Sequence, residues 1–349
     1  MSAGLFHQDN AANREVLRAC PTLMRGFRPK AWVRNPHVQI GLLVRGERRA
    51  APVAWDREER LTMADGGTVS LQWLGSGDGA TAPVVLVMPT ITGDGDDLSD
   101  LVTLIRRELG WTVVVCNRRG HAGVPLTTPR FNTMGNVGDL REQIAHVQTE
   151  RPNAPLFALG TSAGSGVLAR YLGETPDTPL AAGALYCPGY DLTDLFDHAH
   201  AVYSRIMVGR LKRHFLEPNA ALLSDRPGYA ECAAAKDLGS FHRHAHGLAG
   251  FGSRDEYLRA SNPMEVAYDI AIPVLTINAA DDPICNVRMV ERVRKRLIGS
   301  LRNGLLAVTR HGSHCAHLPG RTRRSWAHEV LVEYLRAQGR RVGVAQRVG

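Results

Sequence analysis

The hydrophobic and polar positions of the chain form two patterns that follow each other in turn. One is typical of buried strands and the other of amphipathic helices. Short continuous apolar runs favour strands that are buried on both faces of a parallel sheet. They occupy 83–89, 111–117, 154–160, 272–279 and 304–310. Helical spacing separates them at 97–109, 137–148, 287–298 and 325–337. This alternation predicts an α/β fold with a mostly parallel sheet and helices on both faces.

The segment 61–75 has a different pattern, in which Val69, Leu71 and Trp73 alternate with polar residues after the Gly66-Gly67 pair. Alternation with a period of two around a glycine turn is typical of an antiparallel β-hairpin. We therefore expect a hairpin to open the sheet.

Between residues 193 and 268 the apolar runs disappear, and pieces with helical spacing carry many His and Arg residues. This region is interpreted as a helical cap inserted into one α/β domain. The predicted organisation is an N-terminal extension packed on the core (1–50), a core (51–192 and 269–338), the cap (193–268) and a loose tail (339–349).

Composition is that of an ordinary globular chain, with 44% hydrophobic and 22% charged residues and a mean hydropathy of -0.17. These values argue against a disordered or fibrous protein. The sequence has no apolar run of about eighteen residues and no signal-peptide stretch, so we expect a cytoplasmic protein. The six cysteines are scattered without a Cys-x-x-Cys pair, which argues against a zinc knuckle or a disulfide framework.

The net charge of +8 comes from the two ends of the chain. Residues 1–50 carry nine Lys/Arg against three Asp/Glu, and residues 321–349 carry seven against two. Because the residues between them are slightly acidic in sum, a nucleic-acid-binding core is not expected. The basic ends are interpreted as a solvated surface, or alternatively as peripheral contacts with anionic lipid headgroups.

A Gly-x-Ser-x-Gly motif at residues 160–164 follows the apolar run 154–160 and precedes a helical segment. This context predicts a nucleophile elbow, in which Ser162 occupies a tight strand-to-helix turn. Side chains two residues before and after the serine would clash in such a turn, which explains Gly160 and Gly164.

A serine nucleophile needs a base and an acid, which in this type of sheet follow in the order Ser, Asp or Glu, His. The pair Asp281 and Asp282 follows the run 272–279, and His311 and His314 follow the run 304–310. Since the carboxyl ends of parallel strands meet at one edge of a sheet, these side chains are expected to converge on Ser162.

The chain resembles the α/β-hydrolase group that contains the bacterial YheT-type hydrolases and the eukaryotic ABHD proteins. Members of this group include phospholipases, monoacylglycerol lipases and medium-chain ester synthases. The stretches that carry the resemblance are Asn35-Pro36-His37-Val38-Gln39, Asn117-Arg118-Arg119-Gly120, Leu126-Thr127-Thr128-Pro129-Arg130, Asp139-Leu140, the elbow, Ala279-Ala280-Asp281-Asp282-Pro283 and His311-Gly312-Ser313-His314.

The resemblance implies that Asp282 and His314 complete a triad with Ser162, with Asp281 and His311 as the alternatives. We also expect the backbone N–H groups of Ile91 and Ala163 to form the oxyanion hole. Thr90 departs from the family, which usually has glycine there, and this departure predicts a reshaped oxyanion loop.

These features predict a serine carboxylic-ester hydrolase that acts through an acyl-enzyme, and the resemblance implies medium-chain or lipid-derived esters as substrates. No cofactor and no metal is expected. The apolar acyl pocket is expected to come from six cap residues, namely Tyr203, Ile206, Met207, Val208, Leu211 and Phe215. Two alternatives are an acyltransferase that makes esters from acyl donors and alcohols, and a catalytically idle lipid-binding protein.

Overall fold

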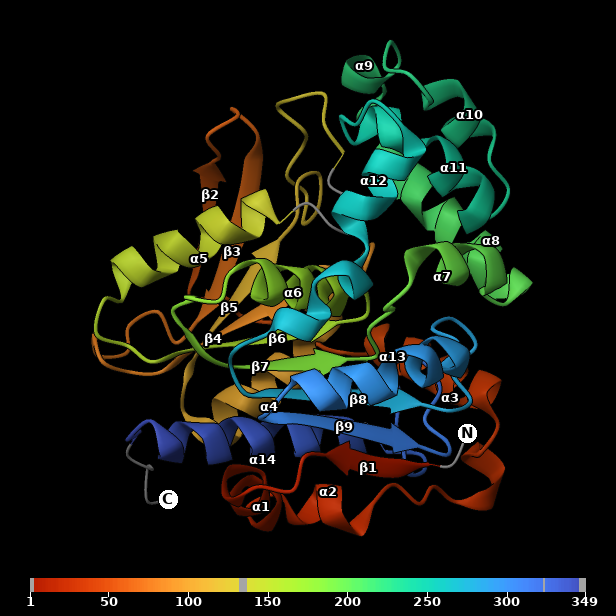
Figure 1. The fold of residues 1–349 in the computed structure, drawn as a ribbon. Helices are drawn as coiled ribbons and strands as arrows, with labels where there is room; N and C mark the ends of the chain where they lie inside the picture. Colours follow the sequence, from red (N-terminus) through yellow and green to blue (C-terminus); the bar gives the residue numbers. More distant parts are fainter. Residues whose placement is uncertain (1–2, 132–136, 323, 345–349) are drawn as a thin grey trace.

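The computed structural model describes residues 3–131, 137–322 and 324–344, and in this part of the chain a nine-stranded sheet forms the centre of the molecule (Figure 1). Its strand order is β1-β9-β8-β7-β6-β4-β5-β3-β2. Six neighbouring strands are parallel and almost entirely buried; five of them match the predicted apolar runs, whereas β7 was not predicted. They are β4 (Val84–Met88), β5 (Thr112–Asn117), β6 (Leu156–Thr161), β7 (Leu180–Tyr186), β8 (Val274–Ala279) and β9 (Gly304–Thr309).

Antiparallel strands close both edges of the sheet. The predicted hairpin consists of β2 (Arg57–Thr62) and β3 (Thr68–Leu74), and β3 pairs with β5. At the opposite edge, β1 (Gly4–His7) pairs antiparallel with β9. The sequence analysis did not predict β1. The N-terminal segment therefore differs from the expected extension, because it forms part of the sheet as well as packing on the core.

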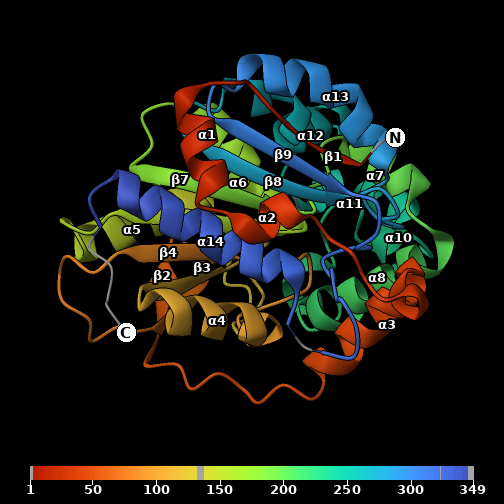
Figure 2. The ribbon, with the colours of Figure 1, turned by 90° about the horizontal axis from the view of Figure 1, so that it is seen from below.

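Helices cover both faces of the sheet (Figures 1 and 2). One face carries α4 (Ser99–Leu109) and α14 (Trp326–Arg341), together with α1 (Ala11–Arg18) and α2 (Pro21–Arg25). The other carries α5 (Gly138–Glu150), α6 (Ala163–Glu174) and α13 (Val287–Ser300). Because α14 continues to Arg341, residues 339–341 are helical rather than loose, and residues 345–349 of the predicted tail lie outside the described residues.

The segment predicted as a cap folds into helices that rise beyond the carboxyl ends of the strands (Figure 1). A third apolar cluster holds these helices together and joins them to Ala163, Ile284 and Met289 of the sheet domain. The helices are α7 (Leu192–His198), α8 (Ala201–Leu211), the π-helical turn η3 (Lys212–Leu216), α9 (Ala220–Leu223), α10 (Tyr229–Ala234), α11 (Leu238–Leu248) and α12 (Arg254–Ser261).

Five further helical segments lie in the described chain: η1 (Ala31–Val33), α3 (Pro36–Glu47), η2 (Asp96–Leu98), η4 (Pro263–Glu265) and η5 (Ala267–Asp269). The last two pack near α6. Among the described residues, no helix has the length and apolar character needed to cross a membrane.

Candidate active site

Ser162 lies in a sharp turn between β6 and α6. Its backbone has a positive φ of 51°, with ψ -116°, and its N–H donates to the Tyr186 carbonyl oxygen at 2.8 Å. A Cβ added at Gly160 would lie 2.5 Å from the Gly164 carbonyl oxygen, and one at Gly164 would lie 2.2 Å from that of Met88. The elbow predicted from the motif is therefore present, and it leaves no room for side chains at the two glycines.

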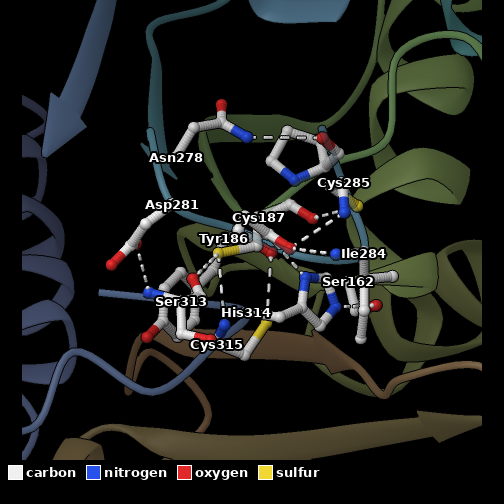
Figure 3. A network of polar contacts seen from close by, with 12 residues as sticks. Ser162, Tyr186, Cys187, Asn278, Asp281, Ile284, Cys285, Ser313, His314 and Cys315 are labelled. Carbon is white, nitrogen blue, oxygen red and sulfur yellow. Dashed lines mark hydrogen bonds and ion pairs between the residues drawn. The ribbon is translucent and has the colours of Figure 1, made fainter. Parts of the chain in front are cut away.

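A chain of hydrogen bonds joins three of the predicted residues (Figure 3). His314 Nε2 lies 2.7 Å from Ser162 Oγ, and His314 Nδ1 lies 2.8 Å from Asp282 Oδ2. The other carboxylate oxygen, Asp282 Oδ1, accepts the N–H groups of Ile284 and Cys285 at 2.8 and 2.9 Å. These contacts fix the carboxylate, which in turn orients the imidazole toward the serine hydroxyl.

The two alternative residues form a separate pair in the same loops. Asp281 Oδ2 lies 3.5 Å from His311 Nδ1, and Asp281 Oδ1 accepts the Ser313 N–H at 2.9 Å. The spacing of the sequence left both choices open, whereas the folded chain brings Asp282 and His314 to Ser162.

The loop that carries His314 adopts a strained backbone that the sequence did not indicate. Ser313, Cys315 and His317 all have positive φ, between 46° and 56°, which side-chain-bearing residues rarely adopt. The buried His317 ring bridges the Tyr186 hydroxyl at 3.0 Å and the Thr309 hydroxyl at 2.9 Å. His317 therefore fastens the loop to β7 and β9, and burial lowers its pKa to about 3, which keeps it neutral.

The charge on His314 depends on its neighbours. Burial alone would lower the pKa of His314, but the Asp282 carboxylate and Cys285 together raise it well above the ordinary value of 6.5. The site therefore stabilises the imidazolium form, which arises when the histidine removes a proton from a serine.

The predicted oxyanion loop follows β4. The Arg118 guanidinium donates to the Thr90 carbonyl oxygen, and a ring nitrogen of His121 lies 3.0 Å from the Ile91 carbonyl oxygen. Because the Thr90 carbonyl and the Ile91 N–H belong to one trans peptide and point in opposite directions, the Arg118 contact orients that N–H. Ala163 begins α6, where backbone N–H groups have no partner within the helix.

The reshaping of the oxyanion loop by Thr90 stays a prediction. Thr90 is not among the described residues with positive φ, so the backbone at this position does not require glycine. The departure from the family sequence is accommodated without backbone strain at residue 90.

A cavity of about 790 Å³ opens beside Ser162 and His314, between the sheet domain, the cap and the N-terminal segment. Of the six cap residues predicted to line it, Tyr203, Ile206 and Met207 do so. The other three, Val208, Leu211 and Phe215, are instead buried in the apolar cluster of the cap. Helix α3, which was not predicted from the sequence, also supplies several apolar residues to this cavity.

Thiols surround the histidine and could offer metal ligands. Donor atoms of Cys187, His314 and Cys315 lie within 4.8 Å of one another, as do those of Asp282, Cys285 and His314. Burial raises the pKa of the Cys285 thiol to about 11 and that of Cys187 well above its usual value. Metal ligation needs thiolates, and both His314 nitrogens already have partners, so the arrangement fits proton transfer better than metal binding.

Comparisons with known proteins agree with this fold. The model of the family described as "Serine aminopeptidase, S33" (Hydrolase_4) matches residues 99–318. Protein ABHD15 of Homo sapiens is 29% identical over 342 residues, which cover 92% of this chain and 70% of that protein. Phospholipase ABHD3 of Bos taurus is 28% identical over 316 residues, which cover 86% of this chain and 75% of that protein.

Among solved structures, the esterase Pf2001 of Pyrococcus furiosus superposes with a TM-score of 0.55 at 16% sequence identity. The superposition covers 81% of this chain and 93% of that one. The likeness at this identity concerns the fold, whereas the family model and the relatives also point to hydrolase chemistry. The chain thus belongs to the Hydrolase_4 (serine aminopeptidase, S33) family and has the α/β-hydrolase fold.

Proposed function

We propose that this protein is a serine carboxylic-ester hydrolase that acts on medium-chain or lipid-derived esters. The observation that carries the proposal is the hydrogen-bonded series Asp282, His314 and Ser162, which opens onto a largely apolar cavity. The name of phospholipase ABHD3, a relative over most of the chain, supports a lipid-derived substrate.

In the proposed reaction, Ser162 Oγ attacks the acyl carbonyl carbon while its proton passes to His314 Nε2. The tetrahedral intermediate then collapses, and the leaving alcohol takes that proton as the ester bond breaks. A water molecule attacks the acyl-enzyme and gives a proton to His314. As the bond between the acyl carbon and Ser162 Oγ breaks, His314 returns this proton to Oγ, and the carboxylic acid leaves.

The developing oxyanion would be held by the backbone N–H groups of Ile91 and Ala163. A well-placed donor of this kind contributes about 2.7–4 kcal/mol to lowering the barrier. Asp282 stabilises the positive charge on the His314 imidazolium, while the two N–H groups stabilise the negative charge on the oxyanion.

The test is labelling of the purified protein with a fluorophosphonate probe, followed by hydrolysis of p-nitrophenyl esters of increasing acyl length. We expect Ser162→Ala to abolish labelling, and we expect an optimum at medium chain length. Addition of ethanol separates hydrolysis from acyl transfer, since an ethyl ester as the main product would identify an acyltransferase. A folded wild-type protein that neither labels nor turns over esters would overturn the proposal in favour of an idle lipid-binding protein.

A further inference from the structure

Helix α3 buries none of its aliphatic side chains fully. It contains five aliphatic residues (Val38, Ile40, Leu42, Leu43 and Val44), yet Gln39 is its only buried residue. A surface helix of a globular protein normally buries an apolar stripe against the core. The packing of α3 therefore differs from that of α4 or α14, which bury many apolar residues.

Polar contacts hold α3 in place instead. Gln39 Nε2 donates to the carbonyl oxygens of Val33 and Leu318 at 2.9 and 3.0 Å, and its Oε1 accepts the Leu318 N–H at 2.8 Å. Asn35 caps the helix by accepting the His37 N–H at 2.9 Å. His37 Nδ1 lies 2.7 Å from the Tyr203 hydroxyl of α8. The Asn-Pro-His-Val-Gln motif thus fixes the helix through polar contacts, and its aliphatic side chains stay half-buried at the cavity or exposed.

Helices α3 and α8 together form an apolar rim around the cavity, and Figure 2 shows them side by side. Trp32 and Ile206 line the cavity and are also 46% and 52% exposed. Val38 on α3 and Val202 on α8 are 37% and 51% exposed and lie outside the cavity. These four side chains define what we call the α3–α8 rim, and they account for most of the large apolar side chains exposed on the described surface.

Basic residues accompany the rim. The segment 28–49 contains six Lys/Arg (Arg28, Lys30, Arg34, Arg45, Arg48 and Arg49) and one acidic residue, Glu47. Burial, followed by Asp97, raises the pKa of Glu47 to about 7, which weakens its negative charge. The sequence of α8 adds Arg205 and Arg210 and contains no Asp or Glu.

We propose that the α3–α8 rim docks on an anionic lipid surface, so that an acyl chain passes from the lipid directly into the cavity beside Ser162. Apolar side chains on segments that are also rich in arginine fit the boundary between headgroups and acyl chains. The inference rests on the proposed function for the passage of the acyl chain, whereas the docking itself is independent of catalysis.

The test is flotation of the full-length protein with phosphatidylcholine vesicles that contain or lack phosphatidylglycerol, at low and high salt. Wild type should bind vesicles that contain phosphatidylglycerol more strongly, and salt should weaken this binding. The double variant Val38→Ser with Val202→Ser should lower binding about tenfold or more. Since neither valine lines the cavity, turnover of a short soluble ester should be unchanged.

A charge variant, Arg48→Ser with Arg205→Ser, should lower binding about tenfold and flatten its salt dependence. The matched control is Leu222→Ser with Val342→Ser, which removes two aliphatic side chains that are 39% and 48% exposed elsewhere on the molecule. This control should bind vesicles as wild type does.

Three results would overturn the docking proposal. They are a wild type that does not float with anionic vesicles, a control variant that loses as much binding as the rim variant, and a dimer that the rim variant dissociates in light scattering. The last result would mean that a second copy of the chain covers the rim. Vesicle binding without fluorophosphonate labelling would contradict the proposed function and leave the docking surface intact.

Discussion

At the scale of single residues, the site depends on atoms that approach closely around Ser162. Its backbone conformation is tolerable because Gly160 and Gly164 let β4, β6 and α6 meet there. The spacing of the motif was enough to predict this turn. Spacing could not distinguish Asp281 from Asp282, because the two are adjacent and both follow β8; only the fold directs one toward His314 and the other toward His311.

We predict that Gly164→Ala lowers the free energy of unfolding by about 1–3 kcal/mol or more and abolishes fluorophosphonate labelling. The added Cβ would lie 2.2 Å from the Met88 carbonyl oxygen and 2.6 Å from that of Pro89, so the elbow must shift. Urea titration and probe labelling measure the two effects. Gly299→Ala is the matched control, because nothing lies within 4 Å of its Cβ on α13 and alanine favours a helix. Equal behaviour of the two variants would contradict the close approach.

We also predict that kcat/KM for a soluble ester rises with pH through a midpoint above 6.5. Only neutral His314 can accept the serine proton, and Asp282 and Cys285 outweigh the burial that would lower its pKa. Below the raised pKa the imidazolium predominates and activity is lost; above it the neutral form accumulates. A pH profile of the folded enzyme measures this midpoint, and full activity persisting well below pH 6.5 would rule out His314 as the base.

At the scale of elements, a buried ion pair connects parts that the sequence leaves far apart. The Arg119 guanidinium binds both oxygens of Asp139 at the start of α5, at 2.6 and 2.8 Å, and it also binds Asp65 in the turn between β2 and β3. The side chains of Arg119 and Asp139 are 3% and 5% exposed. Two stretches that carry the family resemblance, Asn117-Arg118-Arg119-Gly120 and Asp139-Leu140, are thus joined by this ion pair.

Removal of Asp139 should be costly, since it leaves the buried Arg119 guanidinium with the half-exposed Asp65 as its remaining carboxylate partner. Asp139→Ala is expected to lower the free energy of unfolding by about 3–5 kcal/mol in urea titration. Glu150→Ala, which removes an exposed partner of Arg57, should cost no more than about 1 kcal/mol. If Asp139→Ala cost as little as Glu150→Ala, the pair would not support the fold.

Five of the six parallel strands could be predicted from the sequence because burial on both faces leaves an uninterrupted apolar run. The strand β7 was not predicted, since its sequence consists largely of Ala and Gly. The strand β1 could not be predicted either, because four residues, Gly4–His7, give no periodicity and its partner β9 lies about 300 residues away in the chain. The inward orientation of Val208, Leu211 and Phe215 was equally inaccessible, since it depends on how the cap helices pack on one another. The roles of Gln39 and His317 depend on contacts between distant segments.

At the scale of the whole molecule, three apolar clusters divide the protein into the two faces of the sheet and the cap. The N-terminal segment belongs to the first of these, through Val16, Leu17 and Leu23. It also supplies β1 at the edge of the sheet and α3 at the cavity. The segment predicted as an extension is therefore integral to the fold and to the entrance of the site.

We predict that Leu17→Ala lowers the free energy of unfolding by about 2–5 kcal/mol, because it removes a buried side chain from a packed cluster. Leu222→Ala, at a side chain 39% exposed, should change stability by no more than about 0.5 kcal/mol. Urea titration monitored by tryptophan fluorescence compares them. A small effect of Leu17→Ala would indicate that the N-terminal segment is dispensable to the core.

The most direct test of the central claim compares matched carboxylates and histidines in the same two loops. We measure kcat/KM on a soluble ester for Asp282→Asn and His314→Gln against Asp281→Asn and His311→Gln. We predict losses of about 10⁴-fold for the first pair, which contacts Ser162 directly or through the imidazole, and near wild-type rates for the second. Equal losses in both pairs, or a larger loss in the second, would contradict the assignment of Asp282 and His314 as the partners of Ser162.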